Sequence, residues 1–192
     1  MAERRTRLSP EREQELFTAV LDLLREVGYE ALTMDAIAAR ARSSKATLYR
    51  QWRGKPELVA SALRHAEPVS ITHIDTGTLA GDLRELARRL GEVALRDMEL
   101  VRALGHAMHQ DPELLQAVRA LLVEPELTAL RGMLDRAVRR GELAPDVPAA
   151  QFVPHMVLGA MVGRALVEDR DADAAYLVRY IDAAVLPALG LS

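Results

Sequence analysis

Apolar residues recur at intervals of three and four positions along most of this chain. That spacing places them on one face of an α-helix, because a helix turns once every 3.6 residues. No clear run alternates apolar and polar residues between turn residues, so the pattern predicts no strand. An all-α protein is therefore expected. The first apolar stripe consists of Leu16, Val20, Leu23, Leu24 and Val27.

Residues at the helix ends predict where the helices begin and stop. Ser9 can cap the first helix, Pro10 suits its first position, and Gly28 is expected to end it, since glycine adopts left-handed backbone angles easily. Later helices are expected over residues 55–66, 79–96, 98–109, 112–123, 125–140, 148–168 and 172–188.

Two short helices follow the first one. Thr33 is a natural N-cap for a helix that ends near Arg40, and Ser43 or Ser44 can cap a second that ends near Trp52. Two short helices joined by a tight turn are typical of a helix-turn-helix, in which the second helix enters the major groove of DNA. Trp52 is expected to pack between helices rather than to contact DNA.

Charge supports this interpretation locally but not globally. The 192 residues carry a formal net charge of −3, which excludes a generally polycationic nucleic-acid coat. Residues 36–56 nevertheless contain six Lys or Arg and no Asp or Glu.

The chain has no Cys, so a disulfide scaffold, a thiolate zinc site and a cysteine nucleophile are excluded. The hydrophobic fraction of 49% is enough for a buried core.

The second short helix carries residue types that suit DNA contact. The hydroxyl groups of Ser44, Thr47 and Tyr49 can hydrogen-bond phosphates or base edges, and Lys45 and Arg50 add positive charge. The alternatives are solvated surface charge for the cations and packing between helices for Tyr49.

Neighbouring residues complete the predicted surface. Ala46 is small enough to let the helix approach the groove closely. Thr33 and Lys55 begin the flanking helices, whose N-terminal amide groups can bind phosphate. The predicted DNA-binding residues are Thr33, Arg42, Ser43, Ser44, Lys45, Ala46, Thr47, Tyr49, Arg50 and Lys55.

Three runs of sequence together resemble the DNA-binding domain of TetR-family transcriptional regulators. They are Gly-Tyr-Glu-Ala-Leu-Thr-Met-Asp-Ala-Ile-Ala at 28–38, Ser-Lys-Ala-Thr-Leu-Tyr-Arg-Gln-Trp at 44–52 and Lys-Pro-Glu-Leu at 55–58. The resemblance implies a helix-turn-helix domain over 1–55, a linking helix over 55–66, and a helical effector-binding and dimerisation domain over 67–192. By position, Thr33, Ser44, Lys45, Thr47, Tyr49 and Lys55 match DNA-contact residues of the family.

The same resemblance implies how such a protein acts. It would bind a pseudo-palindromic double-stranded DNA operator as a homodimer in the cytoplasm, and a small-molecule effector would release it. Most members of the family are repressors, and the resemblance implies no cofactor, no membrane and no catalysis.

The turn between the two short helices departs from the family pattern. The family usually has Gly-Val there, whereas this chain has Arg42 and Ser43. An arginine at a left-handed position costs around 1 kcal/mol or shifts the turn. Arg42 can offset this cost by contacting a phosphate or a guanine.

Signals in the C-terminal part are weaker. Met side chains with an aromatic ring and an imidazole suit an apolar or amphipathic effector, and plain core packing is the alternative. The tentative effector pocket consists of Leu104, Met108, Met133, Phe152, His155 and Met156. No metal site is predicted, because no acidic residue at helical spacing completes a zinc site with His106 and His109.

Small residues at 159–163 would let a helix approach its copy in a second subunit closely, with packing inside one chain as the alternative. The tentative dimer interface consists of Gly159, Ala160, Gly163, Leu177, Tyr180, Ile181 and Ala184. The uncharged stretch 147–163 contains prolines and polar residues, so it is interpreted as a core helix rather than a membrane span.

Two other classes of function are the alternatives. A protein-interaction module that has lost DNA binding is favoured only by the Arg42-Ser43 turn. A small helical enzyme is disfavoured, since the sequence contains no paired carboxylates, nucleophile motif or glycine-rich phosphate loop.

Overall fold

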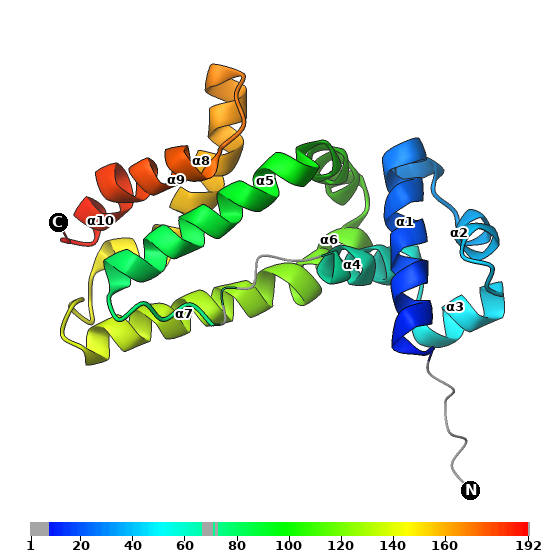
Figure 1. The fold of residues 1–192 in the computed structure, drawn as a ribbon, viewed down its shortest axis with the longest axis horizontal. Coiled ribbons are helices and arrows are strands. Elements are labelled where there is room, and N and C mark those ends of the chain that lie inside the picture. Colours follow the sequence, from blue (N-terminus) through cyan, green and yellow to red (C-terminus); the bar gives the residue numbers. More distant parts are fainter. Residues whose placement is uncertain (1–7, 67–70, 72, 192) are drawn as a thin grey trace, which may run out of the picture. The chain divides into compact units, whose positions relative to one another are not determined.

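The computed structural model describes residues 8–66, 71 and 73–191, with 93–103 described as backbone only. Every regular element in this described part is helical, which confirms the predicted all-α class (Figure 1). Contacts divide the chain into two compact units. Of the described residues, the first unit contains those up to 66 together with 99–123, and the second contains 71, 73–98 and 124–191. The sequence-based division had assigned 99–123 to the C-terminal domain.

Helix bounds follow the expected caps in the N-terminal region. The helices there are α1 (Pro10–Ala31), α2 (Met34–Arg40), α3 (Lys45–Gln51) and α4 (Lys55–His65). Gly28 has φ of 75° and kinks α1, so one further turn follows before the helix ends at Ala31.

The later helices are more continuous than expected. They are α5 (Leu79–Gln110), α6 (Pro112–Val118), the π-helix η1 (Arg119–Val123), α7 (Glu124–Arg139), the 3-10 helix η2 (Pro148–Phe152), α8 (Val153–Glu168), α9 (Ala174–Tyr180), the π-helix η3 (Ile181–Val185) and α10 (Leu186–Ala188). The break expected between 96 and 98 is wrong, because no Gly or Pro interrupts α5 there.

The core of the first unit positions the two short helices. Ile37 of α2, Leu48 of α3 and Leu58 of α4 are fully buried in one cluster with the apolar face of α1. Trp52 is buried as well, and its ring meets that of Phe17 edge-on at 5.7 Å between ring centroids. The expected packing role of Trp52 is confirmed.

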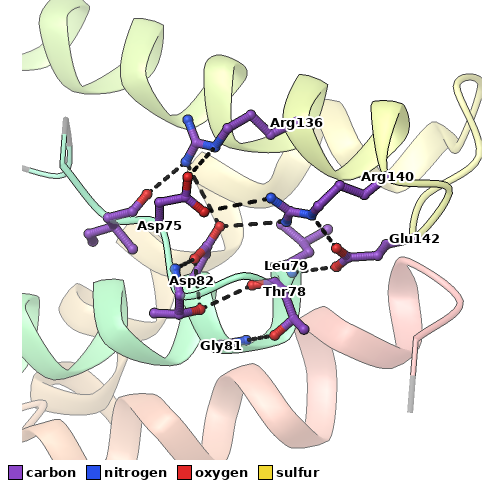
Figure 2. Close-up of polar contacts among 10 residues, drawn as sticks. Asp75, Thr78, Leu79, Gly81, Asp82, Arg136, Arg140 and Glu142 are labelled. Carbon is purple, nitrogen blue, oxygen red and sulfur yellow. Dashed lines mark hydrogen bonds and ion pairs between the residues drawn. The ribbon is translucent and has the colours of Figure 1, made fainter.

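The second unit has its own core and a buried polar network. Asp82, in the first turn of α5, is 0% exposed and accepts hydrogen bonds from the backbone N–H and the hydroxyl of Thr76, at 2.6 and 2.8 Å. Its other carboxylate oxygen lies 3.8 Å from a guanidinium nitrogen of Arg136 on α7 and from one of Arg140, which directly follows α7 (Figure 2). Glu142 accepts a 2.5 Å hydrogen bond from the N–H of Leu79. This network ties the start of α5 to the end of α7.

Candidate nucleic-acid interface

Two hydroxyl side chains cap the helices of the predicted DNA-binding motif. The Thr33 hydroxyl oxygen accepts a 3.1 Å hydrogen bond from the N–H of Ala36, and the Ser44 hydroxyl oxygen accepts one of 3.0 Å from the N–H of Thr47. Ser44 and Thr47 also share a hydrogen bond between their hydroxyl groups, at 2.8 Å. Capping satisfies amide groups that would otherwise lack a partner at each N-terminus, so these residues stabilise the helices that would carry the DNA contacts.

The turn between α2 and α3 contains the expected left-handed residue. Arg42 has φ of 49°, in the region that glycine adopts most easily. The N–H of Ser43, whose side chain is half-buried, closes the turn by donating to the carbonyl of Ala38 at 2.9 Å. Arg12 of α1 reaches across and donates to the carbonyls of Ala41 and Arg42, at 3.0 and 3.4 Å. Sequence reasoning missed Arg12, which is distant from the turn along the chain.

One face of α3 is open to solvent. Lys45, Ala46, Tyr49 and Arg50 are exposed, with Tyr49 at 51% of its surface, while Leu48 on the opposite face is fully buried. Residues three and four positions apart lie together on a helix surface, as 45 and 49, 46 and 49, and 46 and 50 do here. The structure therefore brings these four predicted contact residues onto one accessible surface.

Ion pairs restrain part of the positive charge. Lys45 donates to the Asp35 carboxylate at 2.8 Å, and this hydrogen bond raises the pKa of the Lys45 ammonium. Arg40 pairs with Glu26 at 2.7 Å. Both pairs are exposed, and exposed pairs stabilise a fold little, so they can be exchanged for phosphate contacts.

Lys55 is held more firmly than sequence reasoning anticipated. Its ammonium nitrogen donates to the carbonyl of Tyr29 at 2.9 Å and lies 4.1 Å from the centroid of the same tyrosine ring. The Tyr29 hydroxyl donates to the Asp111 carboxylate at 2.6 Å. Burial, followed by this hydrogen bond, raises the pKa of the Tyr29 hydroxyl, and the hydrogen bond from Tyr29 lowers the pKa of Asp111.

The six tentative effector-pocket residues are not gathered within one unit. Leu104 and Met108 belong to the first unit, and the other four to the second. Met133 is fully buried in the core of the second unit, which agrees with the alternative of plain core packing. Phe152 and His155 are exposed. Met156 is half-buried. Among the described residues, no group of three or more His, Asp or Glu side chains could hold a metal.

The tentative dimer-interface residues divide into two groups. Ala160, Leu177 and Ile181 are buried in the core of their own unit. Those with accessible surface are Gly159, Gly163, Tyr180 and Ala184.

The face of α8 that solvent reaches carries large apolar residues that sequence reasoning missed. Leu158, Val162 and Leu166, spaced by four, are 62%, 54% and 86% exposed, and we call them the α8 apolar stripe. Residues 148–168 are long and apolar enough to cross a membrane by length and composition, and 22% of an apolar 18-residue stretch within them is buried. The expected core helix is therefore buried on one face only, with Val153, Val157 and Ala160 inside.

Comparisons with known proteins cover both parts of the chain. Residues 16–62 match the model of bacterial regulatory proteins of the tetR family, and 73–184 match the tetracyclin repressor-like C-terminal domain. A DNA-binding transcriptional repressor TetR of Mycobacteroides abscessus is 35% identical over 179 residues, 89% of this chain and 90% of that protein. An uncharacterized HTH-type transcriptional regulator of Mycobacterium tuberculosis is 32% identical over 195 residues, 98% of this chain and 94% of that one. The solved structure of the flavonoid-responsive regulator FrrA matches with a TM-score of 0.70 and 25% identity, covering 95% of this chain and 97% of that one.

Proposed function

Since the chain belongs to the TetR family of bacterial regulatory proteins, it is a DNA-binding transcriptional regulator, and we propose that it is a homodimeric repressor that a small-molecule effector releases from its operator. The open, cationic face of α3 carries the proposal. This helix is capped at Ser44, anchored by the buried Leu48, and presents Lys45, Tyr49 and Arg50 to solvent. The family comprises transcriptional regulators, and we propose no catalytic role.

In this proposal α3 enters the major groove. Tyr49 and Lys55 contact phosphates, as do the amide groups around Thr33, while Lys45 and Thr47 reach base edges. The other proposed contacts come from Arg42, Ser43, Ser44, Ala46 and Arg50. Two copies of α3 would contact half-sites about 34 Å apart, or a small multiple of that distance, on a pseudo-palindromic operator.

The α8 apolar stripe supports dimerisation. Three large aliphatic side chains in a row at four-residue spacing would bury substantial apolar area against a second copy. Gly159 and Gly163 lie beside this stripe, three positions before Val162 and Leu166, and have no atom within 4 Å of where a Cβ would stand. We propose that this face of α8, with Tyr180 and Ala184, forms the dimer interface.

Effector release is proposed by analogy with relatives. The M. abscessus relative is named a repressor, and the solved regulator FrrA is named flavonoid-responsive. An effector that binds better to a conformation with the wrong spacing of the α3 copies would weaken DNA binding, typically by 1–3 kcal/mol. The protein would act in the cytoplasm, where bacterial DNA lies.

A matched pair of variants tests the DNA-binding surface. Arg50→Ala and Arg131→Ala each remove one exposed arginine, from α3 and from α7. Binding to a duplex selected by the wild-type protein from a random pool is measured over a salt series. We expect Arg50→Ala to lower the salt slope by about 1, and Arg131→Ala to leave it unchanged. Equal salt slopes for the two variants would show that α3 does not contact the DNA.

A second pair tests the dimer. Val162→Arg places a charge in the α8 apolar stripe, whereas Val123→Arg places one at a comparably exposed valine of η1. Light scattering should show a monomer for Val162→Arg and a dimer for Val123→Arg. A dimeric Val162→Arg protein would refute the proposed interface.

A further inference from the structure

A connected set of contacts links the first turn of α6 to the start of α4 through the end of α1. Asp111 caps α6, where one carboxylate oxygen accepts hydrogen bonds from the N–H groups of Glu113 and Leu114 at 3.0 and 3.1 Å. Its other oxygen accepts the 2.6 Å hydrogen bond from the Tyr29 hydroxyl. The backbone carbonyl of Tyr29 in turn accepts the 2.9 Å hydrogen bond from Lys55. All these residues lie in the first unit.

Tyr29 has little freedom in this arrangement. Its side chain is 5% exposed, its hydroxyl is bound to Asp111, and it directly follows the kink at Gly28. A lysine side chain by contrast has four rotatable bonds and moves freely unless it is restrained. The carbonyl and the ring face of Tyr29 both attract the Lys55 ammonium, and together they hold it at one place beside the first turn of α4.

We propose that Tyr29 and Asp111 are positioning residues for Lys55, and that they make its contact with a DNA phosphate depend on the state of α6. The inference rests on the proposed function, in which Lys55 binds phosphate. The ammonium has three N–H donors, and one bond to Tyr29 leaves others for the phosphate. Tyr29 thus orients the Lys55 ammonium before DNA binds. The conformational entropy of the lysine side chain is already lost in the free protein, so it does not weaken DNA binding further.

The link to α6 gives the contact a regulatory meaning. A displacement of α6 moves its N-cap, Asp111, and breaks a short hydrogen bond to Tyr29 that is assisted by the carboxylate charge. The tyrosine then loses the partner that fixes its hydroxyl end, and Lys55 loses its fixed acceptor. A change at α6 therefore reaches a phosphate contact without requiring any movement of α3.

Two single substitutions cut the link at different atoms. Tyr29→Phe keeps the buried ring beneath Lys55 and removes only the hydroxyl group. Asp111→Ser keeps a good N-cap for α6 but is too short to reach Tyr29. Tyr176→Phe is the control, because Tyr176 also lies under a cation, Arg164, at 4.1 Å, but in the second unit.

The readout is affinity for a duplex selected by the wild-type protein from a random-sequence pool, over a salt series, in two backgrounds. In the natural background Tyr29→Phe and Asp111→Ser each weaken binding roughly threefold to tenfold, and Tyr176→Phe does not. In a Lys55→Met background the first two substitutions have no further effect, since the group that they position is gone. The thermal midpoint is measured in parallel, and its change on Tyr29→Phe is the same in both backgrounds.

The outcomes separate the two proposals. If the wild-type protein selects no duplex, the proposed function fails. If it selects one and Tyr29→Phe weakens binding equally with and without Lys55, Tyr29 is merely structural and the inference is overturned. An unchanged affinity for Tyr29→Phe in the natural background overturns it as well.

Discussion

Replacing Arg42 with glycine should stabilise the protein. Arg42 has φ of 49°, and the left-handed region costs an L-residue about 1–2 kcal/mol. Glycine removes that cost but loses about 0.5–1 kcal/mol more backbone entropy on folding. In the described structure the Arg42 side chain is exposed and makes no hydrogen bond or ion pair, so little else is lost. The net expectation is a gain of about 0.5–1 kcal/mol.

Thermal unfolding measures this gain directly. For a chain of this size 1 kcal/mol shifts the midpoint by roughly 2–4 °C, so Arg42→Gly should raise it by about 1–4 °C. Arg42→Ala is the control, because alanine also lacks the guanidinium but keeps the left-handed strain. Its midpoint should stay close to that of the wild-type protein. All three proteins are compared at one concentration, since the proposed dimerisation would make the midpoint depend on concentration.

The same two variants distinguish the effect of the backbone conformation at position 42 on DNA binding from the effect of the arginine charge. If Arg42 contacts a phosphate, Arg42→Gly and Arg42→Ala should lower the salt slope equally, by about 1. A midpoint that rises equally for both variants, or falls for Arg42→Gly, would refute the strain argument.

Two further predictions concern residues of α5. A Cβ at Gly91 of α5 would lie 2.2 Å from the backbone nitrogen of Ala174, so Gly91→Ala should destabilise the protein by about 1–3 kcal/mol. A Cβ at Gly105 would have no atom within 4 Å, so Gly105→Ala should stabilise the protein by up to about 1 kcal/mol. Thermal midpoints that move in the same direction for the two variants would contradict this packing. Hydrogen bonds from two arginines lower the pKa of Glu85 from 4.5 to about 2. The folded protein therefore gains stability from the ionised Glu85 above pH 4.5 and loses this stability as the pH falls toward 2. The difference in unfolding midpoint between the wild-type protein and Glu85→Gln should shrink over that range. A constant difference would exclude the ion pairs as its cause.

Local signals in the sequence were enough to define the helix-turn-helix. Thr33 and Ser44 cap α2 and α3 as predicted, because a cap depends only on a side chain and amide groups two or three residues away. In the structure Tyr49 is exposed on α3, as expected for a DNA-contact residue, and Leu48 is buried on the opposite side. The absence of glycine at Arg42 was apparent from the resemblance to the family pattern, and the structure gives this residue a positive φ.

Only the tertiary structure shows which side chains form contacts with residues far away in the sequence. Lys55 is held by Tyr29, and Tyr29 by Asp111, which lies 82 residues further along the chain. Aspartate is usually a surface residue, yet Asp82 is fully buried beside Arg136 and Arg140 at the end of α7. The sequence predicts a core helix at 147–163, and only the structure shows that α8 buries one side and leaves the α8 apolar stripe exposed. Helix caps and periods act over one or two turns, whereas burial and ion pairing depend on which segments the folded chain brings together, and that is set by the packing of the whole unit.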